Sequence, residues 1–511
     1  MIHKIFGPPG TGKTTFLLNT VEKQMSSGIN PKQIGYFSFT KRAAVEAKQR
    51  AVRKFTETTE EDLNWFRTLH SLAFNCLGLK TTDIARIGDK NLEKFTEETG
   101  IQISEMRYDN DFYVRTDDPI FNAINVARVR GMDLKEYYQK SDLNCEWFQL
   151  EHYATEYKNF KERENLKDFT DILEELIEQK DRVPELHTVI IDEAQDLSKL
   201  QWKLVKILID KCTDAFIAGD DDQAIYVWNG ADVDGFLDLE SDEVKILEQS
   251  YRVPSSVFPL AKKVITRVKN RQKKNWIPKV DSVGKIEVLD SYSYLCDERF
   301  KDKDVSKGEW LFLSPINITL NPLHEWLKSH GILFERNNQK SISDTVLSAV
   351  LGWENLRKGK DINYNTLKNI YKYLHKDAVA HGHKSLRKAP ENELYTMEVL
   401  KKDYGLLTDK IWHESLTKIG EDKRSYIIAM LKRGIKLKKN ADVRLSTIHN
   451  SKGTEAENVV VFTDMSNKSI TKSFVDDSEI RRLLYVAITR TKNKLFLIRP
   501  LDYQKSLMRF L

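Results

Sequence analysis

The chain has 511 residues, too many for one hydrophobic core, so several domains are expected. Its 40% hydrophobic and 31% charged residues are typical of a soluble globular protein, and its net charge of +5 permits a nucleic-acid partner without establishing one. The sequence has no apolar run of membrane-spanning length, no signal peptide before the first motif and four scattered cysteines. These features exclude a membrane protein and a disulfide-rich secreted protein, and a cytoplasmic location is expected.

The first motif is the run G-P-P-G-T-G-K-T at positions 7–14, which fits the phosphate-binding loop pattern at every fixed position. The apolar run 2–6 predicts a strand before it, and a helix is expected from about Thr14 to Lys23. Glycines let backbone N–H groups surround a phosphate, Lys13 can reach the terminal phosphates, and the Thr14 hydroxyl suits Mg²⁺. The motif predicts a triphosphate site; a chance match in a glycine-rich turn is the alternative. The predicted site comprises Gly7, Pro8, Gly10, Thr11, Gly12, Lys13, Thr14 and Thr15.

The rest of the chain alternates between strand and helix patterns, which predicts parallel sheets covered by helices. Strands are expected at 33–39, 188–191, 214–219, 310–313, 332–335 and 494–498, and helices at 41–53 and 323–330. The segments from about 74 to 167 and 341 to 434 are mostly helical in pattern, and a helix is also expected after Tyr251 that runs through the basic stretch 267–274. The fold predicted is α/β, with two α/β units that are each interrupted by a helical insertion.

A hydrophobic strand ends in adjacent acids in the run I-I-D-E-A-Q-D at 190–196. At the carboxyl edge of a parallel sheet such acids can face the phosphate loop. We expect Asp192 to hold Mg²⁺, directly or through water, and Glu193 to orient and deprotonate the attacking water. A solvated acidic turn is the alternative.

A third motif is the run G-D-D-D-Q-A-I-Y-V-W-N-G at 219–230. Gln223 could sense the terminal phosphate or the attacking water. Tyr226 and Trp228 lie two residues apart, so in an extended segment they would face one side and could stack on bases. Burial in a core is the alternative for the two aromatic residues.

Two arginines and one polar loop complete the motifs. Arg252 and Arg490 each follow an apolar stretch, and a second α/β unit that presents them to the nucleotide could stabilise charge on the γ-phosphate. The alternative for each is a solvated surface arginine. The loop 445–455 gathers hydroxyls, amides and a lysine, a composition suited to nucleic-acid backbone phosphates.

The order of these motifs resembles that of the UvrD/Rep-type helicases of superfamily 1 over nearly the whole chain. The motifs are, in order, GPPGTGKTT, SFTKRAA, RTLHSL, IIDEAQD, GDDDQAIYVW, LEQSYR, STIHNSKGTE and RRLLYVAITRT. The resemblance implies two RecA-like motor domains, each with a mainly helical insertion, and ATP with Mg²⁺ between them. The implied ranges are 1–75 and 168–248 for motor 1A, 76–167 for insertion 1B, 249–345 and 436–511 for motor 2A, and 346–435 for a short insertion 2B.

The resemblance also assigns residues. It places Lys13, Thr14, Asp192, Glu193 and Gln223 at the nucleotide, Arg252 and Arg490 as arginine fingers, Tyr251 on adenine and Glu455 on the ribose. The single-strand channel would be lined by Phe39, Thr40, Thr68, His70, Tyr226, Trp228, Thr447 and His449. The run Lys273-Lys274-Asn275-Trp276 resembles a family segment before the 2A sheet, with an exposed helix end as the alternative.

Three departures from the family pattern stand out. Only residues 1–6 precede the phosphate loop, where the family has a glutamine-containing adenine-recognition segment, so the choice of adenine stays open. Asn229 stands where the family has an arginine. The 2B insertion is short, so unwinding by a monomer stays open, and such a compact member would suit a phage or mobile element in its host's cytoplasm.

The function implied is an ATP-driven translocase on single-stranded DNA that separates duplexes at single-strand/double-strand junctions, with 3′–5′ polarity and with replication or repair proteins as partners. Two alternatives lie within the motor class. One is a translocase that strips proteins or remodels forks without robust monomeric unwinding, and the other is an RNA-directed motor. Outside that class, a phosphate-loop kinase and a non-catalytic nucleic-acid clamp with ATP as a structural switch remain.

Overall fold

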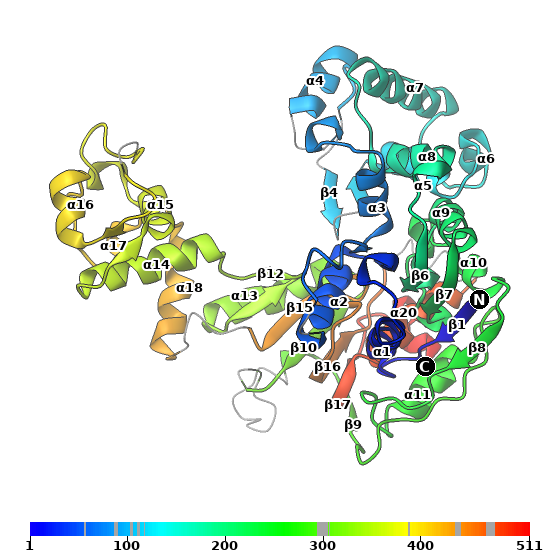
Figure 1. The fold of residues 1–511 in the computed structure, drawn as a ribbon. Coiled ribbons are helices and arrows are strands. Elements are labelled where there is room, and N and C mark those ends of the chain that lie inside the picture. The colour runs from blue at the N-terminus through cyan, green and yellow to red at the C-terminus, as the bar shows by residue number, and fades with distance from the viewer. Residues whose placement is uncertain are drawn as a thin grey trace. The chain divides into compact units, whose positions relative to one another are not determined.

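The computed structural model describes residues 1–55, 58–85, 90–102, 106–109, 113–116, 118–293, 305, 307–386, 389–434, 441–466 and 476–511. The chain divides into two compact units, and each is described by itself (Figure 1). Unit 1 comprises Met1–Lys285, Lys468–Asn493 and Phe510–Leu511, and unit 2 comprises Ile286–Asn467 and Lys494–Arg509.

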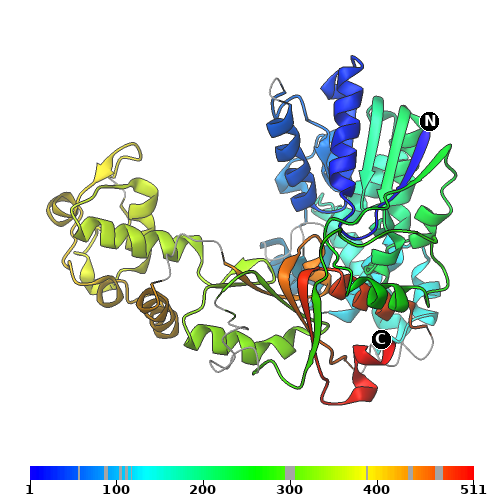
Figure 2. The ribbon, with the colours of Figure 1, turned by 90° about the horizontal axis from the view of Figure 1, so that it is seen from below.

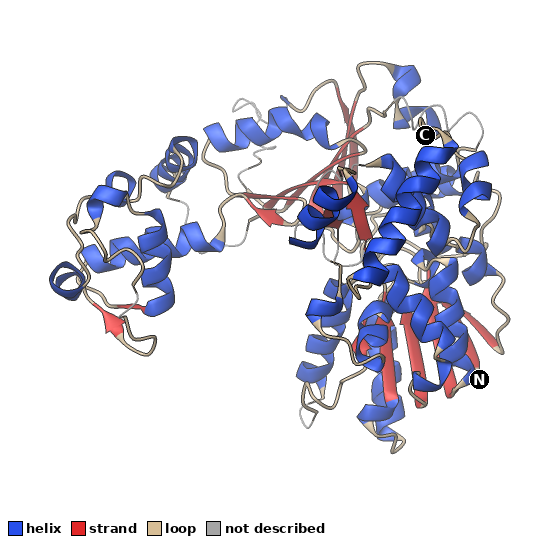
Figure 3. Ribbon diagram, turned by 90° about the horizontal axis from the view of Figure 1, so that it is seen from above, coloured by secondary structure: helices blue, strands red, loops and turns tan. Residues whose placement is uncertain are grey.

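The centre of unit 1 is a six-stranded sheet in the order β3-β2-β6-β7-β1-β8, and all of its neighbouring pairs are parallel. Its strands are β1 (Ile2–Phe6), β2 (Ile34–Ser38), β3 (Phe66–Arg67), β6 (Leu186–Asp192), β7 (Cys212–Gly219) and β8 (Glu243–Ile246). β2 and most of β6 are buried because helices cover both faces of the sheet (Figures 2 and 3). The register pairs Phe6 with Gly219 and Ser38 with Asp192, so the carboxyl ends of these strands meet at one edge.

The helices against this sheet follow the predicted order. They include α1 (Lys13–Ser26), α2 (Lys41–Lys54), α3 (Leu69–Cys76), α8 (Phe169–Glu178) and α9 (Lys199–Asp210). The core that α1 and α2 share with the sheet contains Leu17, Val21, Ala47, Tyr36 and Ile190. The predicted α/β class with parallel strands is confirmed for this unit.

The segment between α3 and α8 is mainly helical, as expected. It contains α4 (Lys90–Thr99), α5 (Pro119–Val129), α6 (Leu134–Gln139) and α7 (Trp147–Arg163). An aromatic cluster of Phe95, Phe121 and Phe160 forms its core together with Leu150. The sequence did not predict the short antiparallel pair of β4 (Met106–Asp109) and β5 (Tyr113–Thr116).

Ion pairs attach this segment to the amino end of α8. Asp168 caps α8 and Asp171 occupies its first turn. Lys161 of α7, which is 7% exposed, lies 2.6 Å from Asp168 and 2.5 Å from Asp171. Arg128 of α5 lies 2.9 Å from Asp168 and 2.6 Å from Asp171. These cations outweigh the cost of burial and hold the pKa of Asp168 well below its usual range.

We expect Lys161→Met to lower the free energy of unfolding by about 3 kcal/mol, because it removes one partner of a buried ion cluster. Lys140→Met is the matched control. Lys140 pairs with Glu136 at 2.6 Å, but its side chain is 65% exposed, so its loss should change stability by less than about 1 kcal/mol. Urea unfolding followed by circular dichroism measures both. Equal effects of the two substitutions would contradict the inferred role of the cluster.

Unit 1 also contains a pair of helices that pack against each other. α11 (Phe258–Ile265) packs against α20 (Ser478–Ile488), which is distant in sequence. The helix predicted after Tyr251 is α11, but its expected extension through 267–274 is wrong, since α11 ends at Ile265 and residues 268–276 have no helical turn. The C=O of Asn270 accepts a bond from Arg482 at 2.8 Å, and the N–H of Gln272 donates to Asp221 at 2.9 Å. These tertiary bonds use backbone groups that a helix would need.

Unit 2 contains a seven-stranded sheet in the order β12-β11-β15-β10-β16-β17-β9. Its strands are β9 (Lys285–Leu289), β10 (Trp310–Ser314), β11 (Phe334–Arg336), β12 (Gln339–Lys340), β15 (Val443–Thr447), β16 (Ala456–Phe462) and β17 (Thr491–Ile498). β10 is parallel to both of its neighbours, while β12 is antiparallel to β11. α13 (Asn321–Ser329) follows β10, as predicted.

The helical insertion of unit 2 shares one hydrophobic core with this sheet. It contains α14 (Asp344–Arg357), α15 (Tyr364–Tyr373), α16 (Met397–Asp403), α17 (Trp412–Ser415), α18 (Glu421–Lys432) and the short pair β13 (Ile362–Asn363) and β14 (Leu394–Tyr395). Trp310 and Phe334 of the sheet belong to the same buried cluster as Trp353 and Met430 of the insertion. The four-domain boundaries expected from sequence stay a prediction. Unit 1 includes α20 and residues 249–285, which those boundaries assign to motor 2A.

No helix within the described ranges is both long and apolar enough to cross a membrane.

Candidate nucleotide site

The phosphate loop connects β1 to α1 and is held from one side by residues 250–252. The N–H of Tyr251 donates to the C=O of Gly10 at 2.8 Å, and the Ser250 hydroxyl donates to the C=O of Pro9 at 2.7 Å. Within the loop, the Thr11 hydroxyl donates to the C=O of Pro8 at 2.8 Å. These bonds occupy carbonyl oxygens of the loop. Such an arrangement suits a loop whose N–H groups bind an anion.

Gly10 and Gly12 both adopt the left-handed conformation, with φ values of 73° and 77°. A Cβ on Gly10 would lie 2.4 Å from Cβ of Arg252, whereas one on Gly12 would meet nothing closer than 3.9 Å. Both positions therefore require glycine for conformation, and Gly10 also requires it for space.

We expect Gly12→Ala to cost about 1 kcal/mol of stability through backbone strain alone. Gly10→Ala should cost about 2–3 kcal/mol, because the methyl group also displaces the 250–252 segment. Urea unfolding distinguishes the two substitutions, and nucleotide titration of the folded Gly10→Ala protein should show weakened binding. Equal losses of stability in the two variants would mean that the segment at Arg252 accommodates the methyl group without a cost in free energy.

Lys13, at the start of α1, reaches the acidic end of β6. Its Nζ lies 2.8 Å from Glu193 and 3.4 Å from Asp192. Burial disfavours the ammonium, but the two carboxylates outweigh that effect and raise the pKa of Lys13 above its usual value. Burial, reinforced by the charge of Glu193, raises the pKa of Asp192, whose Oδ2 accepts a bond from the Tyr36 hydroxyl at 2.8 Å. The predicted lysine and both acids are thus in one site.

Glu193 has a left-handed backbone, with φ of 59°, directly after the strand. Such strain in a non-glycine residue is typical of functional sites. Gln195, which is fully buried, donates from Nε2 to Glu193 Oε2 at 2.6 Å. Its Oε1 accepts from the N–H of Asp220 at 2.9 Å. One buried amide therefore links the end of β6 to the end of β7.

Gln223 lies in the turn after β7, between an aspartate and an arginine. Its Nε2 donates to Asp220 Oδ2 at 2.7 Å, and its Oε1 accepts a bond from Arg490. Arg490 follows α20, is 2% exposed, and also donates from Nε to the C=O of Val486 at 3.1 Å. Hydrogen bonds and ion pairs thus form a continuous chain from Lys13 to Arg490 within unit 1, which we call the relay. Its members are Lys13, Glu193, Gln195, Asp220, Gln223 and Arg490.

The oxygen ligands expected for Mg²⁺ fit that ion chemically. Thr14 offers a hydroxyl in the first turn of α1, and Asp192 offers a carboxylate at the carboxyl edge of the sheet. Mg²⁺ prefers one or two protein oxygens together with phosphate oxygens and water. Among the residues that the structure describes, no group of three or more His, Cys, Asp or Glu side chains could hold a metal by itself.

Arg252 and Tyr251 lie beside the phosphate loop. Arg252 is half-buried against Gly10, and the Tyr251 side chain is 68% exposed. The Tyr251 ring lies 3.9 Å from the position of a Cβ on Gly12. A planar base could stack on this exposed ring next to the loop.

The structure corrects the predicted geometry of the two aromatics at 226 and 228. This segment is not extended: Val227–Asn229 form a 3₁₀ turn that Gly230 closes with φ of 97°. Tyr226 is buried and its ring lies 5.5 Å from that of Phe39, which is also buried. Trp228 remains half-buried. The two rings therefore do not form one exposed face.

Two predicted channel threonines serve as helix caps. The Thr40 hydroxyl accepts from Ala43 N at the start of α2, and the Thr68 hydroxyl accepts from Ser71 N at the start of α3. Thr68 is buried. Capping accounts for both side chains structurally, and any contact with nucleic acid stays a prediction.

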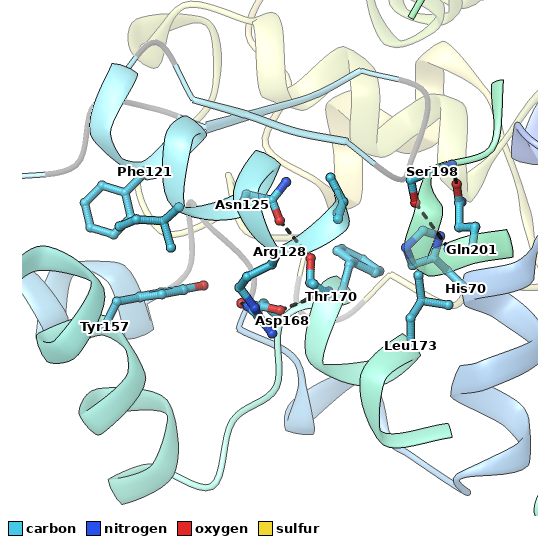
Figure 4. A pocket seen from close by; sticks show the side chains of 13 residues that line it. His70, Phe121, Asn125, Arg128, Tyr157, Asp168, Thr170, Leu173, Ser198 and Gln201 are labelled. Carbon is cyan, nitrogen blue, oxygen red and sulfur yellow. Dashed lines mark hydrogen bonds and ion pairs between the residues drawn. The ribbon is translucent and has the colours of Figure 1, made fainter. Parts of the chain in front are cut away.

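His70 lines a pocket formed by α3, α5, α7, α8 and α9 (Figure 4). The pocket has apolar walls from Phe121, Ile124, Val129, Phe169 and Leu173, and polar groups from Asn125, Arg128, Tyr157, Asp168, Thr170, Ser198 and Gln201. The Thr170 hydroxyl donates to Asn125 at 2.7 Å. Burial lowers the pKa of His70 to about 4 against the opposing charge of Asp168, so the ring is neutral at pH 7.

The remaining predicted residues lie in unit 2. Thr447 ends β15 and its hydroxyl accepts from Asn450 N at 3.3 Å, while His449 begins the following 3₁₀ turn. Glu455 directly precedes β16, and its backbone C=O accepts from Arg444 at 2.6 Å. Within unit 2 these residues lie between the last residue of β15 and the first residue of β16.

Sequence reasoning missed several residues of the site. Gln195 lies inside the motif at 190–196, but the sequence assigns it no function. Tyr36 and Ser250 lie in runs that predict a strand or a motif, and nothing in the sequence marks either residue as part of the site. For Lys274 the sequence predicts only membership of a run that resembles a family segment, with an exposed helix end as the alternative. The second interpretation is wrong for Lys274, which is buried, whereas Lys273 is exposed.

Unit 1 has a parallel sheet with a phosphate loop after β1, an acid pair at the end of β6, and a glutamine after β7 that bonds to an arginine. This arrangement defines a phosphate-loop nucleotide-binding protein. Two family models match the chain. The UvrD/REP helicase N-terminal domain matches residues 2–243, and the UvrD-like helicase C-terminal domain matches residues 442–498. Together they match more than half of the chain, which therefore belongs to the UvrD/REP helicase family, as predicted.

Curated relatives are similar over most of this chain. The ATP-dependent DNA helicase PcrA of Bacillus subtilis is 28% identical over 389 residues, which cover 71% of this chain and 50% of that protein. A probable DNA helicase of Mycoplasma pneumoniae is 25% identical over 383 residues, which cover 68% of this chain and 67% of that protein. DNA helicase II of Haemophilus influenzae is 24% identical over 371 residues, which cover 68% of this chain and 48% of that protein. The chain thus spans about half the length of PcrA and helicase II.

Proposed function

We propose that this chain is an ATP-dependent DNA helicase that moves on single-stranded DNA in the 3′–5′ direction and couples ATP hydrolysis to duplex unwinding. The observation that carries the proposal is the relay, which joins the phosphate-loop lysine to Arg490 within one compact unit. Family membership and the names of PcrA and helicase II support DNA as the track.

In this proposal, Glu193 accepts a proton from the attacking water, and Gln223 orients that water. Lys13 neutralises charge on the terminal phosphates. Arg490 and Arg252 stabilise charge on the γ-phosphate, and Tyr251 stacks on the base. Thr14 and Asp192 would hold Mg²⁺, which offsets phosphate charge when bound.

Single-stranded DNA would contact both units. In unit 1 the proposed contacts are the half-buried Trp228 and His70. A neutral imidazole can donate one hydrogen bond and accept another, and an indole ring can stack on a base. In unit 2 they are Thr447 and His449. Junctions of single and double strands are the proposed substrate, and replication or repair proteins are the proposed partners.

The test is ATP hydrolysis with and without single-stranded DNA, followed by strand displacement on 3′-tailed and 5′-tailed duplexes. We expect DNA to stimulate hydrolysis and only the 3′-tailed duplex to be unwound. Unwinding of the 5′-tailed duplex alone would refute the polarity. Stimulation without displacement would favour a translocase that does not unwind, and stimulation by RNA alone would favour an RNA-directed motor.

A further inference from the structure

Lys274 is buried beneath the nucleotide site, and the proposed chemistry gives it no role. Its side chain is 0% exposed and lies in the irregular segment after α11. Its Nζ lies 2.8 Å from Asp220 and 3.0 Å from Asp222, and it also bonds to Asp221. The Phe6 ring closes another side, with its centroid 5.7 Å from Nζ.

The ammonium of Lys274 must be charged, because it is the cation that faces all three carboxylates. Burial alone would lower its pKa, but the aspartates outweigh burial and raise that pKa above its usual value. Arg271 is the second cation of the cluster, and it donates twice to Asp222, at 2.7 Å and 2.6 Å. An uncompensated carboxylate at this depth would be costly, so each cation limits where its partner acid can lie.

Asp220 connects this cluster to the relay. Its Oδ1 faces Lys274, while its Oδ2 accepts from Gln223 Nε2 at 2.7 Å. An ionised carboxylate only accepts hydrogen bonds, so Gln223 must turn its NH₂ group toward Asp220 and its Oε1 away. That orientation presents Oε1 to Arg490.

The backbone of the same residue orients a second amide. The N–H of Asp220 donates to Gln195 Oε1 at 2.9 Å, which leaves Gln195 Nε2 to donate to Glu193 at 2.6 Å. A shift of Asp220 would therefore disturb both the glutamine proposed to orient water and the glutamate proposed to accept its proton.

We propose that Lys274 is a positioning residue for ATP hydrolysis, which anchors Asp220 so that Gln223 and Gln195 keep the amide orientations that Arg490 and Glu193 require. This inference rests on the proposed function. A purely structural lysine would stabilise the fold without any selective effect on the chemical step. A positioning lysine should affect turnover far more than nucleotide binding, since it touches no residue of the phosphate loop.

The test compares Lys274→Met with Arg271→Met in the full-length protein. Both remove a cation from the same cluster, with side-chain exposures of 0% for Lys274 and 11% for Arg271. Of the two, only Lys274 bonds to Asp220. We expect Lys274→Met to lower kcat for ATP hydrolysis about 10-fold to 100-fold more than Arg271→Met does, as for a misplaced catalytic group. The dissociation constant of a fluorescent ATP analogue should stay within about threefold of wild type in both variants, because ground-state contacts are unchanged.

A second variant addresses the risk that Lys274→Met does not fold. The double substitution Lys274→Met/Asp221→Asn keeps the net charge of the cluster while it still removes the anchor of Asp220. It should fold, bind the analogue and show the same selective loss of kcat. Wild-type kcat in the folded double variant, or equal kcat losses for Lys274→Met and Arg271→Met, would overturn the inference. Absence of ATP hydrolysis by the wild-type protein would instead refute the proposed function.

Discussion

Glu193→Gln is expected to reduce ATP hydrolysis by about 10³-fold while ATP still binds, because an amide cannot accept the proton of the attacking water. The substitution keeps the shape of the side chain. Lys13 then loses its contact at 2.8 Å with a charged oxygen but keeps Asp192 at 3.4 Å. Single-turnover hydrolysis and titration with a fluorescent ATP analogue measure the two effects separately.

Glu175→Gln is the matched control for this experiment. Glu175 lies in α8 and pairs with Lys167 at 2.5 Å, and its side-chain exposure of 27% is close to the 30% of Glu193. It therefore reports the loss of a half-buried ion pair away from the site, and wild-type hydrolysis is expected. If Glu193→Gln leaves ATP turnover unchanged, the assignment of Glu193 as the base is wrong.

Arg490→Lys is expected to lower kcat by about 10³-fold or more, the range found for arginines that stabilise transferred phosphoryl groups. A lysine keeps the positive charge but lacks the planar fork. Arg490 uses that fork to donate from Nε to Val486 O at 3.1 Å and from a second nitrogen to Gln223. One ammonium cannot make both bonds in this geometry. We therefore expect weaker stabilisation of the phosphate charge and a less fixed orientation of Gln223.

Arg481→Lys, in the helix α20 that Arg490 follows, provides the comparison. Arg481 is also buried, but it donates to Asp477 at 2.8 Å and to the C=O of Phe510 at 3.3 Å, so it joins α20 to the end of the chain. We expect this variant to lose thermal stability and to keep its kcat. Steady-state ATPase assays and thermal melts distinguish the two outcomes, and wild-type kcat for Arg490→Lys would refute the proposed role.

The fold class followed from sequence because its signals are local. Apolar runs of strand length alternate with helical patterns, and β1, β2, β6 and β7 lie close to the predicted ranges. The insertions were expected as helical for the same reason. The antiparallel β4–β5 pair was missed, since two strands of four residues each carry little periodicity.

Wrong predictions arose where tertiary contacts override local pattern. The basic stretch 267–274 has helical composition, but the Asn270 carbonyl and the Gln272 amide bond to other segments. Tyr226 and Trp228 have the spacing of one strand face, yet the backbone turns between them and Tyr226 packs on Phe39. Side-chain spacing predicts a common face only if the backbone conformation is known.

The sequence by itself determined the phosphate loop, the acid pair and the glutamine, because each depends on residues within one short segment after a strand. Only the tertiary structure joined them into the relay, since Gln195 and Asp220 meet only where β6 and β7 lie side by side. It also brought Lys274 to the aspartates after β7 and Arg490 to Gln223. Contacts between residues this far apart in sequence depend on how the chain packs, and no local pattern records them.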